Sequence, residues 1–249
     1  MVKKIWEIEA GQSMFNASSG KIRNISDVDR PFAAYLYTGG RVTLFTKTEQ
    51  VFEIGLNVGT VGPNAFGQEV QEGLHDAVGF YKIRGWEYQV ANEAGINSSF
   101  RYSGLLLRSK SNTDLSFNTY ATIGTSFSSA GAGILFRTGR INDLSKSVSF
   151  NSRISNSGND TVPKTEFFIF TRPVLNFIMY DATIQGGLFS DNKGPVTFKP
   201  NPFQYSQEFG FNYSARRWTL NFFLTFRSRD VKTQYKPHQY GSAVIYYRF

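Results

Sequence analysis

Apolar and polar residues alternate with a period of two along most of the chain, a pattern typical of β-strands. Near the C-terminal end, for example, Leu220, Phe222, Leu224 and Phe226 share one face of such a segment. The alternation predicts ten strands, no helix longer than three turns, and no linker that would divide the chain into domains. The predicted strands span residues 3–15, 32–45, 50–61, 88–107, 114–125, 129–138, 172–189, 204–214, 217–228 and 239–249.

The connections and the polar strand positions favour a transmembrane β-barrel over a soluble β-sandwich. Most connections alternate between long and short, as in barrels that cross outer membranes. They are 16–31, 62–87, 190–203 and 229–238 (long) and 46–49, 108–113 and 215–216 (short). The connections at 139–171 and 126–128 break this rule. Strand interiors carry many Thr, Asn, Ser, Gln and Tyr residues, whose polar groups a dry sandwich core could not satisfy.

The C-terminal sequence is a further argument for a barrel. In "GSAVIYYRF", Ala243, Ile245, Tyr247 and the final Phe249 lie on one predicted face. This arrangement resembles the insertion signal of bacterial outer-membrane barrels. We therefore expect an all-β fold, an antiparallel transmembrane β-barrel, with a short helix in a long extracellular loop.

The composition limits the classes of binding partner but does not identify a single one. The net charge of +8 suggests an anionic partner such as nucleic acid, phospholipid or lipopolysaccharide, although a basic surface without a partner fits equally well. The absence of cysteine excludes disulfides and thiolate metal sites. No segment has the roughly 18 uninterrupted apolar residues of a membrane helix. Glu7 and Glu9 interrupt the N-terminal apolar stretch, so we expect a strand there and not a signal peptide.

The segment "VGPNAFGQEVQEGLHDAVGF", residues 61–80, interrupts the strand pattern and predicts a short helix over residues 68–79. One stripe of this helix presents two carboxamides and an imidazole, from Gln68, Gln71 and His75. A second stripe is apolar and is expected to pack on the barrel; it consists of Val70, Leu74 and Val78. A loop histidine is most often a surface residue without a role, but imidazole is also the usual general base near neutral pH.

We expect the charged residues Asp29 and Arg30, and the second histidine, His238, to have no direct role in chemistry. Asp29 and Arg30 precede a proline at a strand entrance, and we expect them to fix the loop through an ion pair. His238 lies in the loop sequence "QYKPHQYG" without comparable polar company, and we interpret it as a surface residue.

Three motifs also carry a resemblance to a known family. They are "DRPFAAYLYTGG" (residues 29–40), "VGPNAFGQEVQEGLH" (residues 61–75) and "GWEYQVANEAG" (residues 85–95). In this order and spacing the sequence resembles the lipid A 3′-O-deacylase family of the outer membrane. The resemblance is specific over roughly residues 5–95 and weaker but collinear through the later strands.

The resemblance implies a monomeric, twelve-stranded barrel in the outer membrane of a Gram-negative bacterium. It implies calcium-dependent hydrolysis of the 3′-linked acyloxyacyl ester of lipid A, with lipopolysaccharide and not nucleic acid as the partner. It places His75 as the general base for water and Gln71 in the same active-site cluster. It also places Lys21 as a residue that helps hold the oxyanion, although a lysine in a loop is equally often an ordinary surface residue.

The chain departs from the family pattern at its calcium site. The family's calcium-binding Asn-Asp pair and a hydroxyl residue of its oxyanion site precede the region where this sequence begins. We therefore expect residues 1–249 to form a single barrel domain that lacks the first two family strands, with calcium ligands unknown. An acid that can follow the family's histidine is replaced here by Tyr81, and nothing singles out the nearby acids as substitutes.

Several alternatives stay open at this stage. The sequence is either a shortened or mis-started product of a longer barrel, or a ten-stranded remnant without catalysis. A non-enzymatic barrel, such as a pore or a structural protein, would be indifferent to His75. A soluble basic β protein that binds nucleic acid is the most distant alternative, because the sequence has no clustered basic and aromatic platform.

Overall fold

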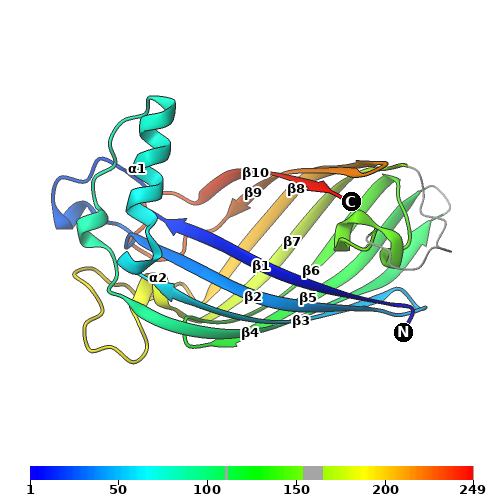
Figure 1. The fold of residues 1–249 in the computed structure, drawn as a ribbon, viewed down its shortest axis with the longest axis horizontal. Helices are drawn as coiled ribbons and strands as arrows, with labels where there is room; N and C mark the ends of the chain where they lie inside the picture. The colour runs from blue at the N-terminus through cyan, green and yellow to red at the C-terminus, as the bar shows by residue number, and fades with distance from the viewer. Residues whose placement is uncertain (110–111, 154–164, 249) are drawn as a thin grey trace.

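The computed structural model describes residues 1–109, 112–153 and 165–248. Ten antiparallel strands form one curled sheet in which each strand pairs with its neighbour in the sequence (Figure 1). The strands are β1 (Lys3–Phe15), β2 (Ala33–Phe45), β3 (Gln50–Val61), β4 (Glu93–Ser109), β5 (Thr113–Gly124), β6 (Phe127–Arg140), β7 (Thr165–Asp181), β8 (Phe203–Ala215), β9 (Trp218–Arg227) and β10 (His238–Tyr247). Two helices, α1 (Gly67–Val78) and α2 (Ala182–Gln185), follow β3 and β7. No helix in the described part of the chain is long and apolar enough to span a membrane.

The predicted all-β fold with ten strands is confirmed, and two strand positions need correction. The fourth strand begins at Glu93 and not at residue 88, because Trp86–Tyr88 forms a 3₁₀ turn. The seventh strand spans Thr165–Asp181 and not residues 172–189. It ends early because the side chain of Asp181 accepts a hydrogen bond from the amide of Thr183, which caps α2.

The alternation of the sequence corresponds to an apolar outer surface and a polar interior. Along β9 the predicted apolar face, Leu220, Phe222, Leu224 and Phe226, is turned outward and 40–44% exposed. Polar side chains of the same strand, such as Thr225, are buried on the inner side. Large apolar side chains are exposed at outward positions of other strands in the same way, for example in β3 and β8. A sheet with this pattern suits a lipid exterior and a hydrated interior.

The described part of the long connection after β6, residues 141–153, folds into the interior of the barrel. It forms short 3₁₀ turns at Leu144–Lys146 and Val148–Phe150, at the end of the barrel where both chain termini lie (Figure 1). Leu144 packs against inward residues of the first three strands, namely Ile5, Phe45 and Val51. Val148 packs against inward residues on the other side of the barrel, namely Leu135, Phe168 and Phe170. The segment therefore connects opposite walls across the interior.

Buried polar groups fix this interior segment. Arg137 forms a bidentate ion pair with Asp114, with nitrogen–oxygen distances of 2.9 and 2.6 Å. Both side chains are fully buried. Arg137 also donates to the hydroxyl of Ser147 at 2.7 Å. The carboxylate of Glu166 accepts from the same hydroxyl and from the amide of Val148. Because these charges are paired and hydrogen-bonded, their burial is tolerated. The hydrogen bonds to Ser147 and Val148 hold the turns in one position.

Candidate functional site

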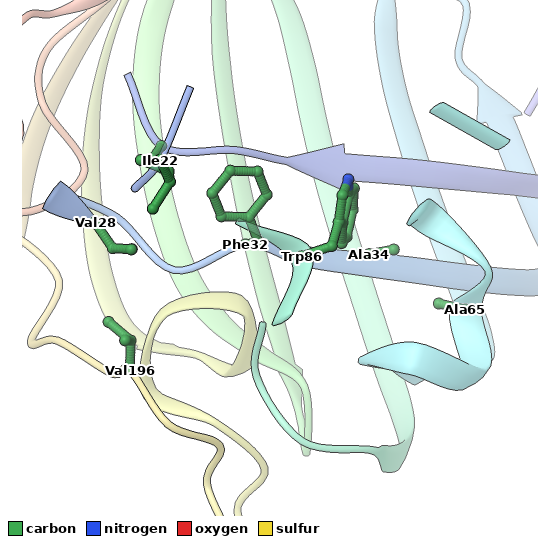
Figure 2. Packing of buried hydrophobic residues seen from close by; sticks show 8 residues of the cluster. Ile22, Val28, Phe32, Ala34, Ala65, Trp86 and Val196 are labelled. Atoms are coloured by element: carbon green, nitrogen blue, oxygen red, sulfur yellow. The ribbon is translucent and has the colours of Figure 1, made fainter. Parts of the chain in front are cut away.

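The loops at the opposite end of the barrel have their own hydrophobic core (Figure 2). Its buried members come from four loop and strand segments: Ala17, Ile22, Val28, Phe32, Ala34, Ala65, Trp86 and Val196. Trp86 lies at its centre, 2% exposed, with its ring edge-on to Phe32 at a centroid distance of 5.5 Å. The N-terminal part of α1 packs on this loop core.

The first turn of α1 is packed tightly onto the loop core. Gly67 is buried against Ala34 and the Trp86 ring, and a Cβ atom at Gly67 would lie only 2.4 Å from the Ala34 Cβ. The Trp86 indole N–H donates a hydrogen bond of 2.9 Å to the Oε1 atom of Gln71. The Gln12 side chain of β1 donates to the carbonyl of Ala65, just before the helix. These contacts fix both the position of α1 and its rotation.

The expected helix is confirmed at Gly67–Val78, but the expected packing of its apolar stripe is wrong. Val70, Leu74 and Val78 are 46%, 56% and 53% exposed and do not pack on the barrel. The partly buried face is instead the polar one, with Gln71 and His75. The reason is the bond between Gln71 and Trp86, which turns the carboxamide stripe toward the loop core.

The end of α1 places aromatic residues over His75. Gly79 adopts a left-handed conformation (φ +74°), its amide bonds to the Asp76 carbonyl, and the Phe80 amide bonds to the His75 carbonyl. This is the Schellman arrangement, for which glycine is the favoured residue. The chain then reverses, so that the rings of Phe80 and Tyr81 stand edge-on to the imidazole at centroid distances of 5.4 and 5.7 Å.

The tautomer of His75 follows from one hydrogen bond. Its Nδ1 atom lies 2.8 Å from the backbone carbonyl oxygen of Tyr81. A carbonyl can only accept, so Nδ1 carries the proton in the neutral ring and Nε2 keeps a free lone pair. Among the described residues, no hydrogen bond occupies Nε2 of this ring. The imidazole is thus oriented as a proton acceptor at a partly exposed position.

Lys21 also lies close to the Tyr81 ring. Its Nζ atom is 5.2 Å from the centroid of that ring, within the range of a cation–π interaction. Lys21 also forms a parallel β-bridge with Arg84, which joins the loop after β1 to the loop after α1. The structure therefore brings His75 and Lys21 to the same aromatic ring, with Gln71 one helical turn before His75. Their catalytic roles stay a prediction.

Tyr81 is the residue of this cluster that the sequence reasoning passed over as a mere replacement for an acid. Its carbonyl orients His75, and its ring contacts both His75 and Lys21. A Cβ atom at Gly20 would lie 2.9 Å from the Tyr81 hydroxyl, so a glycine at that position leaves room for the ring. The sequence signal was the aromatic pair directly after the helix-ending glycine.

The residues near His75 do not fit a calcium ion. Calcium takes six to eight oxygen ligands, usually with carboxylates among them. Among the described residues, no group of three or more His, Asp or Glu side chains is arranged to hold a metal. Of the acids on α1, Glu72 already accepts a hydrogen bond of 2.9 Å from Gln68, while Glu69 and Asp76 are exposed.

A second polar cluster beside the loop core corrects two expectations. Arg30 does not pair with its neighbour Asp29; its Nε atom lies 3.0 Å from Asp230, which is 200 positions later. Asp29 instead accepts hydrogen bonds from the amides of Ser18 and Tyr235. Both residues therefore fix the loops, as expected, but with distant partners.

His238 is part of this cluster and is not a plain surface residue. Its Nε2 atom lies 2.7 Å from the Gln234 side chain and 3.5 Å from Asp230, and the residue is only 33% exposed. Burial works against ionisation of Asp230. The hydrogen bond with His238 and the charges of Arg227 and Arg30 outweigh this effect, so the pKa of Asp230 lies well below its usual range.

Replacing Gly67 by alanine is expected to lower the rate of a reaction catalysed by His75 roughly ten- to hundredfold. A shift of about 1 Å in a reacting group can lower a rate by that factor. The added Cβ would overlap Ala34 and the Trp86 ring, so α1 and His75 must move. Gly73→Ala is the matched control: nothing lies within 4 Å of its Cβ, and the helix gains up to about 1 kcal/mol. Initial rates of the two variants test this, and equal rates would contradict the anchoring role of Gly67.

Together, the antiparallel barrel sheet, the apolar outer surface and the helix-bearing loop define a bacterial outer-membrane barrel with a candidate site at its rim. The chain belongs to the family described as outer membrane protein LpxR, whose model matches residues 1–249. Its structure is similar to that of LpxR from Salmonella typhimurium, with a TM-score of 0.79 and 18% sequence identity. The match covers 98% of this chain and 84% of that chain, and it confirms the barrel fold. A comparison with curated protein sequences finds no match.

Proposed function

We propose that this protein is a lipid A 3′-O-deacylase of the outer membrane, an ester hydrolase in which His75 is the general base. Membership of the LpxR family supports the class of activity. The observation that carries the proposal is the orientation of His75. Its Nδ1–H is held by the Tyr81 carbonyl, so its Nε2 lone pair is available to a water molecule.

The proposed reaction uses His75 and Lys21, which lie close to the same Tyr81 ring. Nε2 of His75 takes a proton from water while the water oxygen attacks the ester carbonyl carbon. The ammonium group of Lys21 stabilises the negative charge that develops on the carbonyl oxygen. The C–O bond then breaks, the acyl group leaves as a carboxylic acid, and His75 returns its proton to the alkoxide of the sugar.

Gln71 is proposed to act in substrate binding and helix positioning. Its Oε1 atom accepts the bond from Trp86, so its carbonyl end is committed to the loop core. The NH₂ group is the part of this side chain that can donate to a substrate. Gln71 would thus fix one end of the polar stripe and present a donor one turn away from the base.

Calcium dependence is part of the proposal through the family resemblance alone. Calcium bound near the ester would stabilise negative charge on the carbonyl oxygen. The described residues around His75 do not supply a suitable ligand set, so no step is assigned to the ion. Its ligands, on this proposal, come from outside the residues that form the His75 cluster.

The pore alternative receives less support from the interior of the barrel. An open pore needs a continuous water-filled path, and wide barrels provide one. Here the segment with Leu144 and Val148 joins opposite walls through apolar contacts. The buried pair of Arg137 and Asp114 fixes that segment in place. These contacts favour a closed interior over a conducting one.

The proposal is tested by mass spectrometry of lipid A after incubation with the refolded protein, with calcium and separately with a chelator. The expected product has lost one acyloxyacyl unit from the 3′ position. Removal of a different chain would refute the positional assignment, and equal activity with chelator would refute calcium dependence. No change of mass, with a barrel shown to be folded, would support the inactive or non-enzymatic alternatives.

A further inference from the structure

The apolar stripe of α1 has no protein partner among the described residues. Its side chains follow one side of the helix and are about half exposed: Phe66, Val70, Leu74 and Val78. Phe80 and Tyr81, just after the helix, add 64% and 52% exposed rings to the same region. Exposed apolar surface of this extent on a helix marks an interaction face.

The position of α1 relates this face to the outer wall of the barrel. The helix lies at one end of the barrel, runs across the long axis and projects beyond the outline of the sheet (Figure 1). The long axis corresponds to the membrane normal in a barrel of this class, so α1 runs roughly parallel to the membrane plane. This is the orientation of an interfacial helix and not of a spanning one.

The apolar outer wall reaches nearly to the base of α1. Val58 of β3 is 48% exposed on that wall and lies three positions before the end of the strand at Val61. Ile96 and Ile123 on the following strands are likewise exposed close to the same rim. At about 3.3 Å per residue the lipid-facing band ends within roughly 10 Å of the rim. The chain then leads directly into α1, whose first residue, Gly67, follows six positions after Val61.

Charges beside the stripe suit a membrane surface. Lys82 and Arg84 follow directly after the exposed rings and are themselves exposed. The acids Glu69 and Asp76 lie away from the apolar stripe, on the side that would face water. Basic residues next to an apolar helix face attract anionic lipid headgroups.

We propose that α1 is an interfacial helix whose stripe of Phe66, Val70, Leu74 and Val78 is inserted among the acyl chains of the surrounding leaflet. Such helices are buried about 5–10 Å into the boundary between headgroups and chains. Ester bonds of membrane lipids lie at this depth, so the insertion would hold His75 level with the bond to be cleaved. The inference rests on the outer-membrane placement within the proposed function, and not on hydrolysis itself.

The test uses single cysteines, because the chain contains none of its own. Val70→Cys and Leu74→Cys report on the stripe, and Glu69→Cys and Asp76→Cys on the same helix are the matched controls. Each variant carries an environment-sensitive dye and is reconstituted in phosphatidylcholine–phosphatidylglycerol vesicles that contain a doxyl-labelled lipid. Quenching by the lipid is expected to be at least about twofold stronger at the two stripe positions than at the controls, with a blue-shifted emission.

Equal, water-like emission at all four positions would overturn the proposal. So would a blue-shifted but unquenched dye at Leu74, because that result means a protein partner covers the stripe. The outcome is independent of the activity assay. Lipid quenching at Leu74 in a protein without hydrolysis would support the insertion while refuting the deacylase proposal.

Discussion

His75→Ala is expected to lower the rate of ester hydrolysis at least about a hundredfold, since a positioned general base typically contributes that much or more. The imidazole is partly exposed, and among the described residues its hydrogen-bond partner is the Tyr81 carbonyl, so its removal should leave the barrel folded. The rate is measured as release of the acyl product from lipid A. Folding is checked by the mobility of the unheated barrel in gel electrophoresis.

Asp76→Ala is the matched control for this experiment. Asp76 is the next residue on the same helix and is exposed, and successive helical side chains point in directions about 100° apart. Its variant should keep a rate close to that of the original protein. If His75→Ala also keeps this rate, His75 is not the base, and the hydrogen bond with Tyr81 only stabilises the end of α1. Loss of activity in both variants would instead indicate a general disturbance of the helix.

The strands could be predicted from the sequence because period-two alternation is a direct consequence of strand geometry. Residues such as Leu220 and Phe222 alternate without interruption and are predicted to share one face, which the structure shows to be the outer one. The seventh strand is predicted too far along the chain, since residues 167–170 are all apolar and do not alternate by polarity. There Phe168 and Phe170 point inward against the interior segment, where apolar contacts replace water.

The rotation of α1 could not be predicted from its amphipathic pattern. Periodicity shows that one side is apolar, but it does not show whether that side faces protein or lipid. The deciding contact is the bond between Gln71 and Trp86, two residues whose pairing needs the folded loop. The same limit applies to Tyr81, whose contacts with His75 and Lys21 depend on the reversal after Gly79.

Adjacent opposite charges in the sequence proved to be a poor guide to pairing. Asp29 and Arg30 are neighbours, but successive side chains point in different directions and each found a distant partner. The true pair joins the loop before β2 to the loop after β9. Such a contact joins segments far apart in the sequence. It can be identified only from the three-dimensional structure, in which the curled sheet brings the two loops together.

Because this ion pair is buried, Asp230→Asn is expected to destabilise the loops at the rim by about 3–5 kcal/mol. The variant leaves the guanidinium of Arg30, which is 1% exposed, without its carboxylate partner. Hydrogen exchange of amides in the loop after β9 is the measurement, because it detects local opening without unfolding of the barrel. Asp191→Asn removes the same charge from an exposed loop position and should leave exchange unchanged.

The effect also has a predicted pH dependence. The pKa of Asp230 is lower in the folded protein than in an unfolded chain, so its stabilising contribution is present above about pH 4, the usual pKa of an aspartate. The contribution is lost as the pH falls from there toward the depressed value. Loop protection in the original protein should therefore decrease on acidification, while protection in Asp230→Asn should change little. Parallel pH profiles in the two proteins would show that the pair with Arg30 does not hold the loops together.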